Sequence, residues 1–198
     1  MVVAAGTETY FIDALSDRLE ATALTEDEKS FNASILYGRD VSAADVVSEA
    51  RRYPMMADRV LVVVREAQNL RDFEALSAYF KNPNPTTVLF LAFMGKTPDK
   101  RREGYKSLLA NHHAYIEAVP LNEGQAKAWI RSESTRRVLK IEDTAISLLY
   151  ESVGTDLTRL AHELDKLAVA LGEGAMVTPV EVEKHVGISR EFNNLELI

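Results

Sequence analysis

Short apolar runs alternate with amphipathic segments through the first 119 residues of the chain. The apolar runs have the length and composition of buried β-strands, and they cover residues 2–5, 33–37, 60–64, 88–93 and 115–119. Between these runs, apolar residues recur at the spacing of one helix face. The alternation predicts an α/β fold, in which a mostly parallel sheet of five strands carries helices on both faces.

Four helices are expected between the predicted strands. Ser42 and Asp45 have the spacing of a capping box, so they predict the start of a helix that runs to Arg52. The other three helices are indicated by apolar residues at helical spacing: Phe11, Leu15 and Leu19; Phe73, Leu76 and Phe80; and Tyr105, Leu108 and Leu109.

The rest of the chain has a helical pattern, and no further strand is expected after Val119. A stripe of leucines predicts a helix with Thr155 as its N-cap and Gly172 as its terminator. The stripe consists of Leu157, Leu160, Leu164, Leu167 and Leu171. We therefore expect two domains, an α/β domain over residues 1–121 and a small helical domain over residues 122–198.

One more short helix is expected near the end of the second domain. Thr178 can serve as its N-cap, Pro179 as its first-turn proline and Glu181 as its capping-box carboxylate.

Composition narrows the class of protein. Of the 198 residues, 46% are hydrophobic and 27% are charged, as in an ordinary folded chain. No apolar run approaches the roughly 18 residues of a membrane span, and the N-terminus lacks the basic flank of a signal peptide, so we expect a cytoplasmic protein without membrane contact. The absence of cysteine excludes disulfides, zinc fingers and a thiol nucleophile. The net charge of −7 disfavours nucleic-acid binding through the chain's own charge.

The turn after the first predicted strand contains Gly6 and invites comparison with a phosphate-binding loop. A P-loop requires a second glycine and a lysine that reaches the outer phosphates, whereas this turn continues with Thr7 and Glu8. The Glu8 carboxylate would occupy the helix N-terminus where phosphate binds, and would repel it. The third strand ends in Arg65 and Glu66. An arginine in place of the magnesium-binding aspartate of ATPases would not hold the metal.

Other candidates for chemistry are weak. His112 and His113 are adjacent, so they cannot share a helix face in the way that metal ligands four residues apart do. His162 falls on the polar flank of the leucine stripe, where a surface role is expected. The sequence therefore predicts no catalytic residue, no metal site and no cofactor.

Two adjacent methionines depart from the amphipathic pattern. Pro54 ends a helix and restricts Tyr53, and Met55 and Met56 follow in a connector, where neighbouring side chains cannot easily both point into one core. One interpretation is that both methionines cap the edge of the sheet. The other is that one stays exposed and binds an apolar groove of a partner, a use to which methionine is suited.

A basic run between Lys96 and Lys106 is a second unusual segment. Such a run could follow a phosphate backbone, but Asp99 and Glu103 interrupt it and Tyr105 is its only aromatic residue. A solvated helix start is the favoured interpretation.

Several segments, taken in order, resemble one known family. They are residues 51–67, which read RRYPMMADRVLVVVREA; residues 99–106, which read DKRREGYK; residues 154–157, which lead to residues 163–167; and the closing residues 189–198. Together with the degenerate phosphate loop, they are similar to the delta subunit of the bacterial DNA polymerase III clamp loader. The likeness covers nearly the whole chain.

The resemblance implies an AAA+ type parallel-sheet domain with a degenerate P-loop, followed by a small helical lid domain. It implies a subunit of a DNA polymerase holoenzyme, a nucleotidyltransferase complex, that binds and opens the sliding clamp during DNA replication without ATPase activity of its own. In the family, two bulky apolar residues before the third strand wedge into a hydrophobic pocket of the clamp. The matching positions are Met55 and Met56, with Tyr53 and Pro54 shaping the loop. Family members often carry Phe or Leu there.

The implied partners are the sliding clamp and, for the full-length protein, the other clamp-loader subunits, with DNA contacted indirectly, weakly or not at all. The family's helical C-terminal collar domain, which assembles the loader, is expected to be absent because the chain stops at Ile198. Two alternatives stay open from the residues alone. One is a nucleotide-binding α/β enzyme with an unorthodox phosphate site near Gly6, and the other is a DNA-binding scaffold that uses residues 96–106.

Overall fold

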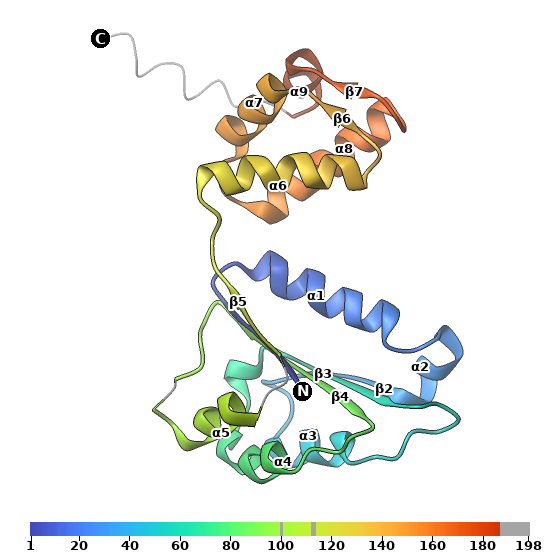
Figure 1. Ribbon diagram of the computed structural model, residues 1–198, viewed down its shortest axis with the longest axis vertical. Helices are drawn as coiled ribbons and strands as arrows, with labels where there is room; N and C mark the ends of the chain where they lie inside the picture. The colour runs from blue at the N-terminus through green and yellow to red at the C-terminus, as the bar shows by residue number, and fades with distance from the viewer. Residues whose placement is uncertain (100, 112–113, 187–198) are drawn as a thin grey trace. The chain divides into compact units, whose positions relative to one another are not determined.

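The computed structural model describes residues 1–99, 101–111 and 114–186 of the chain, which divides into two compact units, Met1–Val119 and Pro120–Ile198. The first unit is built on a sheet of five parallel strands in the order β2-β3-β4-β1-β5 (Figure 1). The strands are β1 (Val2–Gly6), β2 (Ala33–Tyr37), β3 (Val60–Arg65), β4 (Thr87–Met94) and β5 (Ala114–Ala118). The predicted α/β class and the five-stranded parallel sheet are confirmed.

Each face of the sheet carries its own apolar core. Successive side chains of a strand point to opposite faces, so Val3 and Val62 belong to one core and Ala4 and Val63 to the other. In β3, all residues from Val60 to Val64 are fully buried. Burial on both faces explains why the strands read as continuous apolar runs, without polar residues in alternation.

Helices cover both faces of the sheet, as predicted. The helices α1 (Thr9–Thr22) and α2 (Glu26–Asn32) lie on one face, and α3 (Ala43–Ala50), α4 (Ser77–Lys81) and α5 (Glu103–Asn111) lie on the other (Figure 1). Two 3-10 turns, η1 (Ala67–Asn69) and η2 (Phe73–Leu76), follow β3.

The start of α3 confirms the predicted capping box. The Ser42 hydroxyl accepts a hydrogen bond from the Asp45 N–H at 3.4 Å, and the Asp45 carboxylate accepts one from the Ser42 N–H at 2.8 Å. The helix ends at Ala50, slightly earlier than expected. Its amphipathic pattern and its cap point to the same start, which is why this boundary was predictable.

Two details of the first unit differ from the sequence prediction. The helix α2 was not expected, because its residues Glu26–Asn32 are mostly polar and form no apolar stripe; a capping box of Thr25 and Glu28 starts it. The expected regular helix around Phe73, Leu76 and Phe80 is instead the turn η2 followed by the five-residue α4. Buried aromatic packing places these apolar side chains in the core without a continuous helix.

The second unit is mainly helical, with α6 (Glu123–Arg136), α7 (Asp143–Val153), α8 (Leu157–Leu171) and α9 (Pro179–His185). The expectation of no strand after Val119 is wrong, since the two-residue strands β6 (Lys140–Ile141) and β7 (Met176–Val177) pair in parallel. Strands this short leave no periodic pattern in a sequence. None of the helices in the described ranges has the length and apolarity that crossing a bilayer requires.

The caps of the second unit were predicted in part. Gly172 ends α8 with a φ of 83°, as expected, but Asp156 and not Thr155 is the N-cap: its carboxylate accepts a hydrogen bond from the Arg159 N–H at 3.0 Å. At α9, Thr178 is the N-cap residue and Pro179 begins the helix, yet Thr178 makes no side-chain capping bond. Glu181 lies 3.2 Å from His185 Nε2, one turn further on.

A network of ion pairs around a nearly buried carboxylate joins the end of α6 to α8. The Glu133 side chain is 8% exposed and pairs with Arg136 at 2.7 Å and with Arg137 at 2.6 Å. Arg137 also reaches Asp165 of α8, at 2.7 Å. Because removal of one partner from a buried ion pair leaves an uncompensated charge, these groups act together in stabilising the unit.

Candidate functional site

The four residues Tyr53–Met56, called the methionine segment here, connect α3 to β3 and expose their apolar side chains. Tyr53 is 86% exposed, Met55 is 55% exposed and Met56 is fully exposed. The interpretation that both methionines cap the edge of the sheet is therefore wrong. Isolated exposed apolar side chains are common, but three within four residues form an apolar patch that marks a candidate contact surface.

The chain leading into the methionine segment is anchored to the core of the first unit. The Ala50 carbonyl accepts hydrogen bonds from Tyr79 Oη at 3.3 Å and from Thr87 Oγ1 at 2.8 Å. Two residues later, the Arg52 carbonyl accepts one from Asn84 Nδ2 at 3.3 Å. Burial raises the pKa of the Tyr79 hydroxyl, which keeps it protonated as a donor. The backbone just before the methionine segment is therefore held by three side-chain hydrogen bonds.

The helix α2 holds the other side of the methionine segment. Its last residue, Asn32, makes two hydrogen bonds to the backbone of Met55, at 2.7 and 2.9 Å. Arg52 Nη2 donates to the Phe31 carbonyl at 2.7 Å. The connector between α3 and β3 is thus tied to a helix more than 20 residues earlier in the sequence.

Phe31 is a surface residue that the sequence pattern did not single out. Its side chain is 59% exposed, and its own carbonyl and the neighbouring Asn32 both bond to the connector that carries the methionine segment. Because α2 is otherwise polar, one phenylalanine makes no stripe and gave no periodic signal. A single aromatic residue within an otherwise polar stretch is the sequence signal that could have pointed to Phe31.

Met56 has a backbone conformation that is uncommon for its residue type. Its φ is 53°, in the left-handed region that favours glycine. Such a conformation persists only where the surrounding structure imposes it. Met56 is restrained on one side by the hydrogen bonds at Met55, and on the other side the chain enters the buried strand β3 at Val60.

The Glu49 carboxylate of α3 also binds the connector, through an ion pair with Arg52. Glu49 of α3 accepts hydrogen bonds from Ser34 Oγ at 2.6 Å and from Arg52 at 2.7 Å. The hydrogen bond from Ser34 is the larger cause, and the one from Arg52 the next, of a pKa of the Glu49 carboxyl below its usual range.

A pocket of about 360 Å³ lies beside the methionine segment and is lined by Arg51, Tyr53, Asn82, Pro83, Asn84 and Pro85.

The turn after β1 differs from a phosphate-binding loop. Glu8 is the N-cap of α1, and its carboxylate accepts a hydrogen bond from the Tyr10 N–H at 3.3 Å. The Glu8 N–H donates to the Ala118 carbonyl at 3.1 Å. A Cβ on Gly6 would lie 1.9 Å from that same oxygen, so the β5 backbone is packed against the turn. An acidic cap and a carbonyl oxygen occupy the place where a P-loop presents N–H groups to phosphate.

The charged residues at the end of β3 form ion pairs with other side chains. Arg65 pairs with Glu20 at 2.8 Å and with Asp17 at 3.0 Å, both on α1. The hydrogen bond to Glu20 is the main cause that raises the pKa of Arg65. Glu66, with a φ of 53°, pairs with Arg39 at 2.7 Å. These side chains neutralise one another, and among the described residues no group of three or more His, Cys, Asp or Glu side chains could hold a metal ion.

Two cations of the basic run are paired with carboxylates. Arg101 pairs with Asp99 at 3.0 Å and Arg102 with Glu74 at 2.9 Å. Tyr105 is buried and stacks on Phe73 with 4.3 Å between ring centroids, so its ring is not available to stack on a base. These contacts favour the solvated helix start. Lys100, His112 and His113 lie outside the described residues, and His162 is exposed.

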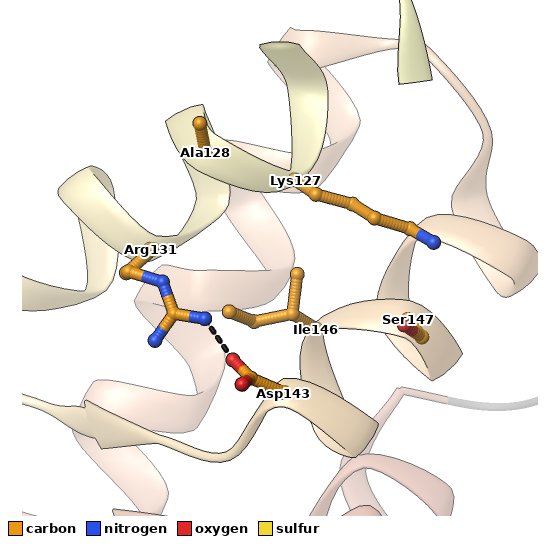
Figure 2. A pocket seen from close by; sticks show the side chains of 6 residues that line it. All are labelled: Lys127, Ala128, Arg131, Asp143, Ile146 and Ser147. Carbon is orange, nitrogen blue, oxygen red and sulfur yellow. Dashed lines mark hydrogen bonds and ion pairs between the residues drawn. The ribbon is translucent and has the colours of Figure 1, made fainter. Parts of the chain in front are cut away.

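Figure 2 shows a pocket in the second unit, lined by Lys127, Ala128 and Arg131 of α6 and by Asp143, Ile146 and Ser147 of α7. Arg131 forms an ion pair with Asp143, and Lys127 pairs with Glu123 at 2.7 Å. Each cation that lines the pocket therefore already has a carboxylate partner, and the pocket presents no net charge that would select an anion.

The fold of this chain is found in other proteins of known structure. The parallel sheet with helices on both faces, followed by a helical unit, is a fold that the chain shares with solved structures of other proteins. The RuvB Holliday junction branch migration motor of Thermotoga maritima has a TM-score of 0.54 at 14% identity, covering 94% of this chain and 61% of that one. Domain III of the replication initiation protein DnaA from the same organism has a TM-score of 0.50 at 14% identity, covering 96% and 84%.

Comparison of the amino-acid sequence with known families shows the family of this chain. The profile of the family described as "DNA polymerase III, delta subunit" matches residues 3–119, more than half of the chain. The chain belongs to this family. The DNA polymerase III subunit delta of Bacillus subtilis (strain 168) is 26% identical over 203 residues, covering 98% of this chain. The solved DNA clamp loader delta protein of Bacillus subtilis has a TM-score of 0.74 at 24% identity, over 95% of this chain. The chain spans 58% of the length of both relatives.

Proposed function

We propose that this chain is a clamp-loader subunit of a DNA polymerase holoenzyme that binds and opens a sliding clamp through the methionine segment. Membership of the delta family supports the clamp-loader role. The observation that carries the proposal is the exposure of Tyr53, Met55 and Met56 on a connector that is hydrogen-bonded on both sides. The other partners proposed are the remaining subunits of the loader, and DNA is contacted indirectly or not at all.

The proposed mechanism is differential binding. Met55 and Met56 lose unfavourable contact with water when they enter an apolar groove, and a long thioether side chain can adapt to that groove. A ring-shaped clamp that offers a wider groove when one interface is loosened is stabilised in that state by the difference in affinity. The subunit therefore shifts the clamp toward the open form without chemistry of its own.

Phe31 extends the proposed clamp-binding surface to α2. Its ring is exposed, and its backbone carbonyl is hydrogen-bonded to Arg52 at the base of the methionine segment. Aromatic side chains at such surfaces bury much apolar area at a low cost in rotamer freedom. The proposed surface therefore comprises Phe31, Tyr53, Pro54, Met55 and Met56. The second unit, in the same proposal, is the helical lid domain.

The proposal includes no ATPase activity. It is supported by the Glu8 carboxylate at the N-terminus of α1, by the packing of Ala118 against the turn at Gly6, and by the pairing of Arg65 with acidic residues of α1. Calorimetry with ATP and magnesium tests this part. Heat that shows saturable binding at micromolar nucleotide would refute it, and no observation in the structure favours the nucleotide-dependent enzyme as a second function.

The deciding experiment measures binding of the cognate sliding clamp to the unmodified chain and to the double variant Met55→Ala, Met56→Ala. The variant is expected to keep its fold and to lose affinity. Met176→Ala is the matched control, because Met176 is a 49% exposed methionine in the second unit. An equal affinity of the double variant and the unmodified chain would remove the proposed contact.

A further inference from the structure

Asn32 has an unusual set of hydrogen bonds for a polar residue that is 1% exposed. Its Oδ1 accepts from the Met55 N–H at 2.7 Å, and its Nδ2 donates to the Met55 carbonyl at 2.9 Å. The same Nδ2 donates to the Glu28 carbonyl at 3.0 Å, inside α2. The carboxamide therefore satisfies both backbone groups of a single distant residue and one carbonyl of its own helix, which makes it a rigid bridge.

The bridge restrains the backbone at the point where the methionine segment turns outward. Holding the N–H and the C=O of Met55 leaves little freedom to the two peptide planes that flank it. The next residue, Met56, has the left-handed φ of 53° that needs an external restraint. Met55 is only half-exposed and Met56 is fully exposed, so packing of their side chains cannot supply that restraint by itself.

We propose that Asn32 is a positioning residue for the clamp-binding segment, one that holds Met55 and Met56 in the binding conformation before the partner arrives. The inference rests on the proposed function of the methionine segment. Its physical basis is preorganisation: a segment that is already ordered loses less conformational entropy on binding. Asn32 itself is buried and does not touch the partner.

The first test requires no clamp. Amide hydrogen exchange of the unmodified chain should show slow exchange at the Met55 N–H, and Asn32→Ala should make that amide exchange faster while the β3 amide of Val62 stays protected. Asn111→Ala is the matched control, because Asn111 Nδ2 donates to the Ser107 carbonyl of its own helix and Asn111 lies far along the chain from Met55. Fast exchange at Met55 in the unmodified chain would overturn the proposal even if the Asn32 variant failed to fold.

The second test measures clamp binding. Freeing the backbone of about one residue corresponds to a loss of affinity of about 5- to 30-fold for Asn32→Ala. Asn32 is proposed to act only by positioning Met55 and Met56. Asn32→Ala should therefore cost little further affinity when both methionines are already alanine. Equal costs in both backgrounds would indicate a general structural role and would overturn the positioning role.

The two proposals fail in different ways. If the double methionine variant loses affinity and Asn32→Ala does not, the positioning role alone is refuted. If neither the methionine variant nor Asn32→Ala changes affinity, the proposed function is refuted and the positioning role with it. Asn32→Ala with lost Met55 protection and lowered affinity, beside an unchanged Asn111→Ala, supports both.

Discussion

The two methionines are expected to contribute unequally to clamp binding, because they differ in exposure. Met56 is fully exposed and can still bury its whole side chain, whereas Met55 is 55% exposed and has about half of its side chain left to bury. Replacing each methionine separately by alanine isolates this difference. The expected difference depends only on the exposed fractions of the two side chains and on an apolar groove in the partner.

Full burial of a methionine side chain is worth about 1.5–3 kcal/mol, and ordering a flexible side chain at an interface costs about 0.5–1.5 kcal/mol. The net loss for Met56→Ala is therefore about 1–2 kcal/mol, or about 5- to 30-fold in Kd. For Met55→Ala, with half the area to bury, the loss is less than about 1 kcal/mol. The free energy of unfolding should show the reverse order, because only Met55 packs against its own chain.

Surface plasmon resonance with immobilised clamp measures the affinity, and urea unfolding followed by circular dichroism measures the stability. Met56→Ala should weaken binding with unfolding unchanged within about 0.5 kcal/mol. A larger loss of affinity for Met55→Ala than for Met56→Ala would refute the argument from exposure. Equal losses with lowered stability in both variants would refute it as well.

Three further outcomes follow from the structure. Phe31→Ala should weaken clamp binding by about 5- to 10-fold and leave stability nearly unchanged, as measured by the same two assays, because the ring is 59% exposed. Val138→Gly should raise the melting temperature of the chain, by relieving a β-branched residue at a φ of 56° and so stabilising it by about 1 kcal/mol, whereas Val169→Gly in the last turn of α8 should lower it. The depressed pKa of Glu49 contributes stability that is present above its ordinary value of 4.5 and lost as the pH falls through the folded-state pKa, so Glu49→Gln should flatten the acid side of a stability–pH curve measured by urea unfolding.

Each of these outcomes can be contradicted directly. Unchanged clamp affinity of Phe31→Ala would remove α2 from the proposed surface. A lowered melting temperature of Val138→Gly would show that the valine side chain stabilises the turn by more than its backbone conformation costs. An acid limb of the same slope in Glu49→Gln would show that the hydrogen bonds from Ser34 and Arg52 contribute nothing to stability near pH 4.

Much of the fold was predictable because burial has a simple sequence signature. A strand covered on both faces must be apolar at every position, and the run Val60–Val64 shows this directly. The leucine stripe of α8 and the capping box at Ser42 were equally clear, since side-chain spacing and local hydrogen bonds are properties of the chain itself. The helix α2 was missed because it is polar and forms no apolar stripe, although the capping box of Thr25 and Glu28 that starts it is local. The two-residue strands β6 and β7 were missed because they depend on each other's pairing in the tertiary structure.

The candidate site was predictable only in part. The pair Met55 and Met56 stood out as two adjacent apolar residues in a connector, but whether they pointed inward or outward could not be decided from spacing. Glu8 showed that the sequence lacks a phosphate loop, and Arg65 showed that it lacks the magnesium-binding aspartate of ATPases. The partners of these two residues, Ala118 and the acidic residues of α1, come from other elements of the fold.

The amino-acid sequence by itself determined the parallel-sheet class, the starts of α3 and α9, the lack of a P-loop sequence and the position of the methionine pair, because each of these depends on residues that are neighbours in the chain. Tertiary structure alone decided that both methionines are exposed, that the Phe31 carbonyl is hydrogen-bonded to Arg52 of the same connector, and that Asn32 holds Met55 from 23 residues away. Contacts of that kind are made by the packing of α2 against the sheet, and no local pattern of polar and apolar residues encodes them.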